Sequence, residues 1–401
     1  MIGENRRSRA HVDKTLLILV FSMAVFGVLA VCVATYSPSS SADTSLLNHI
    51  VESSSAVNQC IFLAMAPFVI AVIMNIPYDF LRRHTELAYY GGTLLVFVVW
   101  IFNRAEGVKA WLDIIWGFTI QPSEFIKLSM ILMLAKTLSR YDRPMSNVRE
   151  FIRIMLMVLI PCGIILLSGE TGSMLVIVFL FAIMLYFSNV DIKLLLGMAA
   201  AALLMLLAIY GFMVASGSDD YRLARILAFV NPDLSPLDDA YQQSQSKMAI
   251  GAGGLTGVGT FVDGALYQLN YVPADWTDFI YATIGEAWGF VGCSLVLLGY
   301  LLIILRMLYL ARYTRDKYGM LIIIGVMAML LFHVFENIGM TLGLMPITGI
   351  PLPFLSYGGS NMVTNMGGIA LVLNVTKNRS LSHSVLTPQT RMNPYSFSRR
   401  T

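Results

Sequence analysis

Charge is what this sequence has least of. Of its 401 residues, 13% are charged and 57% are hydrophobic, whereas soluble domains carry about 25% charged residues. A soluble protein of this length covers its core with charged side chains, and this chain has too few to do so. The composition therefore excludes a soluble enzyme, a disordered protein and a nucleic-acid-binding protein. The small net charge of +3 does not suggest a polyanionic partner either.

Cysteine and histidine are also scarce. The four cysteines lie in apolar runs without a CxxC pair, which predicts small packing residues. The five histidines are scattered along the chain, so no zinc site is visible. P-loop, GxSxG, HExxH and Rossmann fingerprints are missing as well. The function must therefore be sought in residues that stand out against an apolar background.

Apolar runs long enough to cross a bilayer, about 20 residues each, recur through the chain. The first follows a basic stretch and is too long for the apolar part of a signal peptide, so it predicts a retained transmembrane helix. Because helices satisfy their own backbone in lipid, the sequence predicts an all-α polytopic membrane protein. The ten expected spans are 15–36, 58–76, 86–102, 121–139, 151–168, 171–189, 192–215, 279–305, 319–344 and 358–376.

Lysine and arginine orient these spans. With a cytoplasmic N-terminus, most of the 27 basic residues fall on the cytoplasmic side, as the positive-inside rule requires. Both termini are then cytoplasmic. We expect a cytoplasmic N-terminus (1–14), a ten-helix membrane domain (15–376) and a disordered tail (377–401). The one large extracellular loop, 216–278, has a glycine-rich middle whose interleaved apolar residues favour packed structure over disorder.

Two charged residues mark the start of the fourth span. Pro122 can open a helix at its first turn. Glu124 and Lys127 are three residues apart and share a face of that helix, one to two turns below the outer surface. They form either a structural ion pair or a site in which Lys127 meets a phosphate and Glu124 holds it in place. A buried pair contributes little to stability alone, which favours the second interpretation.

A second candidate lies where the large loop meets the eighth span. Partial burial of Asp278 would give it the basicity of a general base. A helix N-cap formed by Thr277 or Asp278 is equally consistent with the composition.

The ninth and tenth spans are joined by a segment that cannot be a smooth helix. Glu336 and Asn337 precede a stretch, 343–360, that is dense in proline and glycine. Such a segment at membrane depth lines a cavity, is buried in protein, or serves as a structural hinge. Glu286 is a further acid within a span, whereas Glu170 lies at an outside turn where solvation is the simple expectation.

These stretches together resemble the SEDS family (RodA, FtsW and SpoVE), over residues 15 to about 380. The resemblance rests on the order and spacing of four motifs. These are Gln121-Pro-Ser-Glu-x-x-Lys127; Tyr241-Gln242-x-x-Gln245-Ser246 with the glycines that end at Gly259; Thr277-Asp278-Phe-Ile with Gly289-Phe-x-Gly292; and Pro346-x-Thr-Gly-Ile-Pro-Leu-Pro-Phe-x-Ser356-Tyr-Gly-Gly-Ser360. The form of the segment from Asn337 to Pro353 is more similar to RodA than to FtsW.

The resemblance implies a peptidoglycan glycosyltransferase of the bacterial cytoplasmic membrane. Such a protein polymerises lipid II at the outer face in cell-wall elongation and cell-shape maintenance, together with a class B penicillin-binding protein. The family's essential aspartate falls on Asp278, and its glutamate and lysine fall on Glu124 and Lys127. The other expected substrate contacts are Lys109, Arg222, Arg225, Gln242 and Ser356.

Two departures and two alternatives accompany this resemblance. Ala110 stands where the family often has a second base, and Glu170 stands where it often has aspartate.

A divalent cation, Mg²⁺ or Mn²⁺, could bridge Asp278 and the lipid diphosphate, although the sequence shows no such site. A lipid II flippase or a non-catalytic scaffold for a penicillin-binding protein are the competing functions, and the lack of internal repeats disfavours a transporter.

Overall fold

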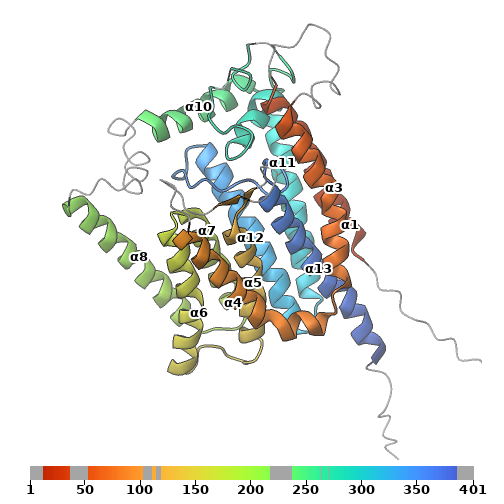
Figure 1. The fold of residues 1–401 in the computed structure, drawn as a ribbon, viewed down its shortest axis with the longest axis vertical. Coiled ribbons are helices and arrows are strands. Elements are labelled where there is room, and N and C mark those ends of the chain that lie inside the picture. The colour runs from red at the N-terminus through yellow and green to blue at the C-terminus, as the bar shows by residue number, and fades with distance from the viewer. Residues whose placement is uncertain are drawn as a thin grey trace, which may run out of the picture.

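Helices make up most of the structure, a computed structural model that describes residues 12–36, 53–102, 111–113, 119–216, 237–262, 264–269 and 271–385 (Figure 1). Strands β1 (Leu112–Asp113) and β2 (Thr119–Ile120) form one short antiparallel pair. The helices are α1 (Lys14–Ala34), α3 (Ser54–Asn75), α4 (Tyr78–Phe102), α5 (Pro122–Leu138), α6 (Val148–Leu167), α7 (Thr171–Phe187), α8 (Ile192–Ser216), α10 (Leu237–Gly253), α11 (Ile280–Arg312), α12 (Lys317–Thr341) and α13 (Gly359–Val385).

Each of the ten expected spans corresponds to a helix, so the prediction of an all-α polytopic membrane protein is confirmed. Among the described residues, six helices are long and apolar enough to cross a membrane by themselves: α1, α3, α4, α6, α11 and α12. Helices α5 and α7 are shorter, with 17 residues each. The last helix continues to Val385, past the end expected at 376, so the first part of the expected tail is helical.

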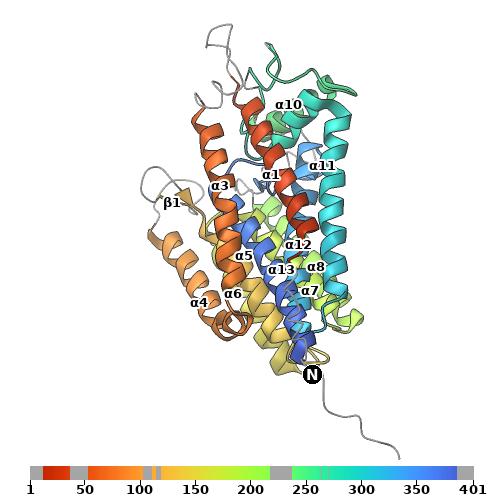
Figure 2. The same cartoon turned by 90° about the vertical axis from the view of Figure 1, so that its right-hand side faces the viewer.

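Consecutive spans alternate in direction through the bundle (Figure 2), and contacts at its inner end agree with this arrangement. At the end expected to be cytoplasmic, Arg306 near the end of α11 pairs with Asp13 before α1. Lys317, at the start of α12, donates to the carbonyl of Tyr141 between α5 and α6. These contacts bring segments with the same expected topology together, as an antiparallel bundle requires.

Helix α12 lies at the centre of the bundle. It packs against α5, α7, α11 and α13, and 78% of its apolar window is buried, against 22 to 56% for the other five long apolar helices. A residue of α12 therefore faces protein on nearly every side. Polar side chains on this helix lie inside the bundle and away from lipid.

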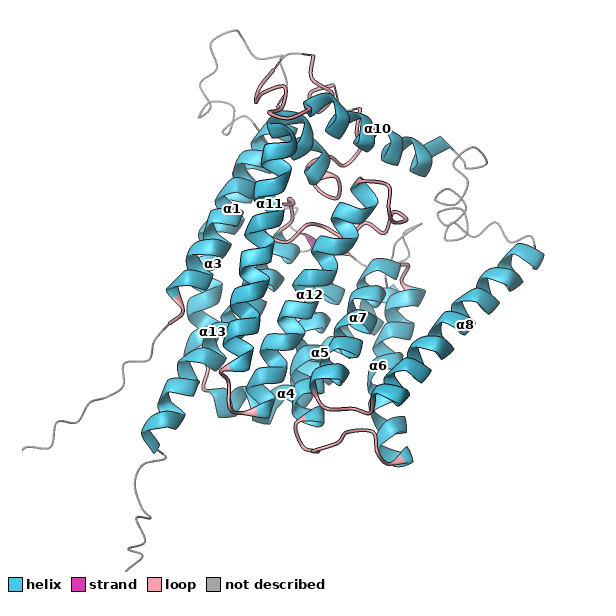
Figure 3. Cartoon of the chain, turned by 180° about the vertical axis from the view of Figure 1, so that it is seen from behind, coloured by secondary structure: helices cyan, strands magenta, loops and turns pink. Residues whose placement is uncertain are grey.

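Helix α10 crosses the outer end of the bundle, as seen from both broad sides (Figures 1 and 3). Gln243 Nε2 donates to the carbonyls of Met340 and Met345, at 3.1 and 2.9 Å. Ser246 Oγ donates to the carbonyl of Thr341 at 2.9 Å. Met340 and Thr341 are the last two residues of α12, so these bonds reach the C-terminal end of that helix. They fix α10 as a cover over the outer end of α12.

The glycine-rich stretch after α10 packs onto a break in α11. Gly289 interrupts α11 with φ 64° and ψ −159°, a conformation that favours glycine. The amides of Val258 and Gly259 donate to the carbonyls of Glu286 and Ala287, at 2.9 and 3.2 Å. A Cβ at Gly289 would lie 2.4 Å from the amide nitrogen of Gly257. The expectation that this stretch is packed is confirmed.

Candidate functional site

Asp278 lies in the turn that leads into α11, at the outer end of the bundle. Helix α11 begins at Ile280, and its N-cap is Phe279, with no side-chain capping bond. The interpretation of Thr277 or Asp278 as the N-cap is therefore wrong, because the helix starts one residue later than such a cap requires. Asp278 is half-buried, so its carboxylate is within reach of a ligand at the outer surface.

The segment between α12 and α13 holds the backbone of this turn in place. Asn337 Nδ2 donates to the carbonyl of Asp278 at 2.7 Å and to that of Ile350 at 2.8 Å. Ser356 Oγ donates to the carbonyl of Thr277 and accepts from the amide of Leu352. Asn337 and Ser356 are both fully buried. The later part of the broken segment, from Ile350 to Ser356, is thus buried in protein, where irregular backbone is tolerated at membrane depth, and it helps to position Asp278.

A second carboxylate lies beside Asp278. Glu336 is 2% exposed, and its Oε2 has no hydrogen-bond partner among the described residues. It lies close enough to Asp278 for the two carboxylates to interact electrostatically. Among the described residues no group of three or more histidine, cysteine, aspartate or glutamate side chains could hold a metal ion. These oxygen ligands are hard, as Mg²⁺ and Mn²⁺ prefer, but a cation here would need further ligands from a substrate.

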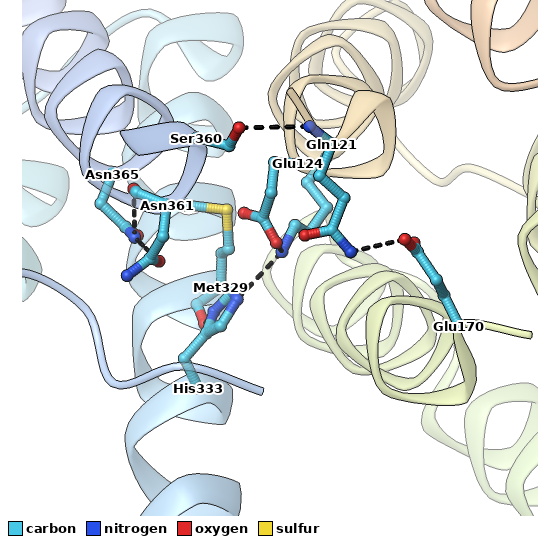
Figure 4. Close-up of polar contacts among 9 residues, drawn as sticks. Gln121, Glu124, Glu170, Met329, His333, Ser360, Asn361 and Asn365 are labelled. Atoms are coloured by element: carbon cyan, nitrogen blue, oxygen red, sulfur yellow. Dashed lines mark hydrogen bonds and ion pairs between the residues drawn. The ribbon is translucent and has the colours of Figure 1, made fainter. Parts of the chain in front are cut away.

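Deeper in the same end of the bundle, Glu124 and Lys127 form a buried ion pair. Pro122 occupies the first turn of α5, as expected, and Lys127 Nζ lies 2.7 Å from Glu124 Oε1. The two side chains are only 1% and 3% exposed. Lys127 Nζ also lies 3.0 Å from Nε2 of His333, a buried residue of α12 (Figure 4). The pair that the sequence predicted is present, and a histidine that the sequence did not single out completes it.

Glu170 lies near the start of α5, close to the Glu124–Lys127 pair. Gln121 Nε2 donates to Glu170 Oε1, and Ser360 Oγ at the start of α13 accepts from the Gln121 amide at 3.1 Å (Figure 4). Glu170 is 7% exposed, so the expectation that it is solvated is wrong. The turn between α6 and α7 folds inward against α5, and this places the acid among polar side chains.

Many buried polar atoms of this region have no hydrogen-bond partner among the residues that the structure describes. In the folded state such atoms bond to water or to a ligand, because a buried polar atom without a hydrogen bond costs about 1–3 kcal/mol of stability. Their concentration between α5, α12 and α13 indicates that the polar cluster is hydrated or binds a polar group. The atoms are Ser123 Oγ, Glu124 Oε2, Glu170 Oε2, Glu336 Oε2, Asn337 Oδ1, Asn361 Nδ2, Thr364 Oγ1 and Asn365 Oδ1.

Asp275, three residues before Asp278, is a buried acid in the same turn. It is 1% exposed, and the Thr283 hydroxyl lies 3.4 Å from its carbonyl oxygen. Burial raises the pKa of the Asp275 carboxyl to about 8, against a smaller opposite effect of the Trp276 amide. Asp275 therefore holds a proton at neutral pH, which makes it a poor base and Asp278 the better candidate.

The remaining candidates separate into three groups. Lys109, Arg222 and Arg225 lie outside the described residues, and their roles stay predictions. Gln242 is half-buried on α10, whereas its neighbour Gln243 makes the bonds to α12. Glu286 accepts from the amides of Leu266 and Tyr267, at 2.6 and 2.9 Å, so it anchors the large loop.

An apolar groove lies apart from this polar cluster, between α1 and α11. It has a volume of about 460 Å³ and is lined by Met23, Phe26, Trp288, Leu295 and other residues, none of them charged. A site for a lipid tail is an apolar groove with few polar groups. The groove has the chemistry of such a site, since an apolar chain needs no polar partner.

Ten spans that enclose polar and charged side chains at one end define a multi-pass α-helical membrane protein with a site at its outer face. A sequence model of the FtsW/RodA/SpoVE family, described as cell cycle proteins, matches residues 14–381. The chain belongs to this family.

Individual relatives are similar over most of the chain. Peptidoglycan glycosyltransferase MrdB of Escherichia coli is 30% identical over 380 residues, which cover 94% of this chain and 97% of the relative. Stage V sporulation protein E of Bacillus subtilis is 32% identical over 326 residues, which cover 80% and 87%. A chain from a peptidoglycan synthase complex that coordinates polymerization and crosslinking has a similar structure, with TM-score 0.74, 26% identity and coverage of 92% and 98%.

Proposed function

We infer that this protein is a peptidoglycan glycosyltransferase of the bacterial cytoplasmic membrane, which polymerises lipid II at the outer face. The observation that carries the assignment is the placement of Asp278. It is held at the outer end of the bundle by Asn337, and the Glu124–Lys127 pair lies deeper in the same end. Relatives that match nearly the whole chain are named for this activity.

The reaction forms one bond and breaks another at the same sugar carbon. The 4-hydroxyl of one lipid II attacks the anomeric carbon of the growing strand and displaces its undecaprenyl diphosphate, with inversion. Asp278 accepts the proton of that hydroxyl as general base, a role typically worth about 10²–10⁴-fold. The negative charge that develops on the diphosphate needs a preorganised positive partner.

Lys127 is the proposed positive partner within the described part of the chain. An ammonium has three N–H donors, and Glu124 and His333 accept two of them. One donor is then left for a phosphate oxygen of the substrate. Lys109, Arg222 and Arg225 are proposed to supply further charge from the outer loops. Gln242 and Ser356 are proposed to border the substrate, Ser356 through the Thr277 carbonyl that it holds.

A divalent cation is a separate proposal for the same site. Asp278 and Glu336 are two carboxylates at the outer end, and diphosphate oxygens of the substrate would complete the ligands of Mg²⁺ or Mn²⁺. The affinity of the purified protein for Mn²⁺ can be measured by titration, with and without lipid II. We expect binding only with lipid II present, and weaker binding for Glu336→Gln.

A class B penicillin-binding protein is the proposed partner, and wall elongation is the proposed process. The support is a similar chain in a complex that combines polymerization with crosslinking. A transpeptidase that acts on the product must meet the strand at the outer face, where Asp278 lies.

The experiment is lipid II polymerisation by the purified protein, with and without a cognate class B partner whose transpeptidase is blocked by penicillin. We expect glycan chains on gels, with more product when the partner is present. Movement of lipid II across vesicles without any chains would instead indicate a flippase. Neither chains nor movement, together with activation of crosslinking in a parallel assay with an unblocked partner, would indicate a scaffold.

A further inference from the structure

His333 is a buried side chain of the polar cluster that the sequence did not single out, and it contacts Lys127 directly. It lies on α12 with none of its surface exposed. Both of its ring nitrogens are engaged, by groups on different sides of the ring (Figure 4).

The two contacts determine which nitrogen carries the proton. Nδ1 lies 2.7 Å from the carbonyl oxygen of Met329, one turn earlier in α12. A carbonyl oxygen only accepts, so Nδ1 must donate. In a neutral imidazole Nε2 is then an acceptor, and it receives a hydrogen bond from Lys127 Nζ at 3.0 Å. The backbone of α12 thus presents the ring to Lys127 as an uncharged acceptor.

The absence of charge on this acceptor matters for Lys127. Glu124 already supplies one negative charge to the ammonium at 2.7 Å. A second carboxylate at position 333 would make the cluster negative and would repel a phosphate. A neutral acceptor instead fixes the direction of the ammonium and leaves the charge of the pair balanced. The third N–H of Lys127 is then oriented without further loss of positive potential.

The same helix also holds Asp278. Asn337 is four residues after His333, so the two side chains lie on one face of α12, one turn apart. Asn337 bonds to the carbonyl of Asp278, while His333 bonds to Lys127. Helix α12 is the most enclosed of the six long apolar helices, so its position is well determined. One rigid helix therefore sets the separation between the two residues.

We propose that His333 is a positioning residue of the glycosyl transfer: it fixes the Lys127 ammonium, at a set distance from Asp278, by acting as an uncharged acceptor. This inference rests on the proposed function. A lysine side chain has four rotatable carbon–carbon bonds, and without the second acceptor its ammonium is fixed by Glu124 alone. Misplacement of a catalytic group by about 1 Å can cost about 100-fold in rate.

Two substitutions separate the contacts of the ring. The amide of His333→Gln reaches about as far as Nε2, so it can accept from Lys127. The shorter amide of His333→Asn reaches only as far as Nδ1, so it can bond to the Met329 carbonyl but not to Lys127. Asparagine makes this bond elsewhere in the protein, since Asn365 Nδ2 donates to the carbonyl of Asn361 at 2.8 Å. Each variant therefore keeps one contact and loses the other.

The measurement is kcat and KM for lipid II polymerisation at equal amounts of folded protein, with the melting temperature recorded for each variant. We expect His333→Gln to keep kcat within about threefold of the wild type. His333→Asn should lose about tenfold or more in kcat, because a hydrogen bond to a charged group is lost, with little change in KM. Equal losses in both variants, a larger loss in His333→Gln, or near-normal kcat in both would overturn the proposal.

A double substitution tests whether His333 acts through Lys127. In a Lys127→Met background, His333→Asn should lower the residual activity by less than about twofold. A further loss of about tenfold would show that His333 acts independently and would overturn the proposal. If His333→Asn does not fold, His333→Gln replaces it in this test. Its small effect on kcat should then disappear in the Lys127→Met background, and an effect that persists there would overturn the proposal. A wild-type protein that makes no chains would instead refute the proposed function.

Discussion

Two ion pairs, at opposite ends of the bundle, differ in how completely their groups are satisfied. At the inner end, Arg306 Nε and Nη2 donate to the carboxylate of Asp13, at 3.1, 3.2 and 2.6 Å. Asp13 also accepts from the Leu16 amide at 2.8 Å and so caps α1. At the outer end, Glu124 Oε1 accepts from Lys127, while Glu124 Oε2 has no hydrogen-bond partner in the described part of the chain.

This difference separates a structural pair from a functional one. The inner pair is partly exposed, with 31% of the Arg306 side chain accessible, and its bidentate geometry ties α11 to the start of α1. The outer pair is fully buried, which costs desolvation energy that a single contact does not repay. The outer pair also leaves Glu124 Oε2 as an unused acceptor, next to other polar atoms without partners in the described residues. A role in binding a ligand explains such a pair better than a contribution to stability does.

The largest expected effect in this comparison is on the outer cation. Lys127→Met should lower the rate of chain formation on the order of 100-fold or more, because it removes a preorganised positive charge. The measurement is lipid II polymerisation at equal amounts of folded protein. The neutral double variant Glu124→Gln/Lys127→Met is the control for stability, since it leaves no unpaired buried charge. It should melt near the wild-type temperature and stay inactive, and wild-type rates in either variant would exclude a role for Lys127 in the reaction.

Removing only the negative charge of the pair, at Glu124, should lower the rate of chain formation by less than the loss of Lys127. Glu124→Gln keeps the shape and can still accept from Lys127, but it no longer balances the ammonium charge. We expect a rate about tenfold lower, from a less well-placed ammonium. Rate measurements on this variant distinguish positioning by Glu124 from direct chemistry. A loss as large as that of Lys127→Met would assign Glu124 a direct role instead.

The turn that carries Asp278 should respond to alkaline pH. The pKa of Asp275 is about 8 in the folded protein, against about 3.9 for an unperturbed aspartate. The folded state therefore holds the proton more tightly, and the contribution of Asp275 to stability is complete below about pH 4. It falls as pH rises and is lost by about pH 8. Melting temperatures between pH 5 and 9 should decline by several degrees, and less steeply for Asp275→Asn; parallel curves for the two proteins would refute this.

The smallest effect is expected at the inner pair. Arg306→Lys replaces the bidentate contact with a single one, and partly exposed pairs contribute about 0–1 kcal/mol. The melting temperature should fall by only a degree or two, and the rate of chain formation should stay within about twofold of the wild type. A rate loss comparable to that of Glu124→Gln would mean that the inner pair affects the reaction at the outer end. It would contradict the distinction between a structural inner pair and a functional outer pair.

The sequence predicted the features that depend on local patterns. The ten helices follow from apolar runs of sufficient length. The Glu124–Lys127 pair follows from three-residue spacing on a helix that Pro122 can start. The irregular segment before α13 follows from its prolines and glycines, and the position of Asp278 at the outer end follows from the orientation of the spans.

Features that depend on contacts between distant segments could not be predicted in this way. His333 meets Lys127 across 206 residues of chain, and only its place one turn from Glu336 and Asn337 on an apolar helix hinted at a role. Glu170 is buried because its turn folds against α5, which no local pattern reveals. Gln243 rather than Gln242 bonds to α12 because of how α10 is rotated, and that rotation is decided by packing.

One pair of matched substitutions tests the central claim most directly. Asp278→Asn and Asp13→Asn each remove one negative charge with little change in size, at opposite ends of the bundle. Asparagine caps helices about as well as aspartate, so Asp13→Asn should form chains at the wild-type rate with a slightly lower melting temperature. Asp278→Asn should lose chain formation by about 10²–10⁴-fold at an unchanged melting temperature, because the general base is gone. Near-normal chains from Asp278→Asn would contradict the account.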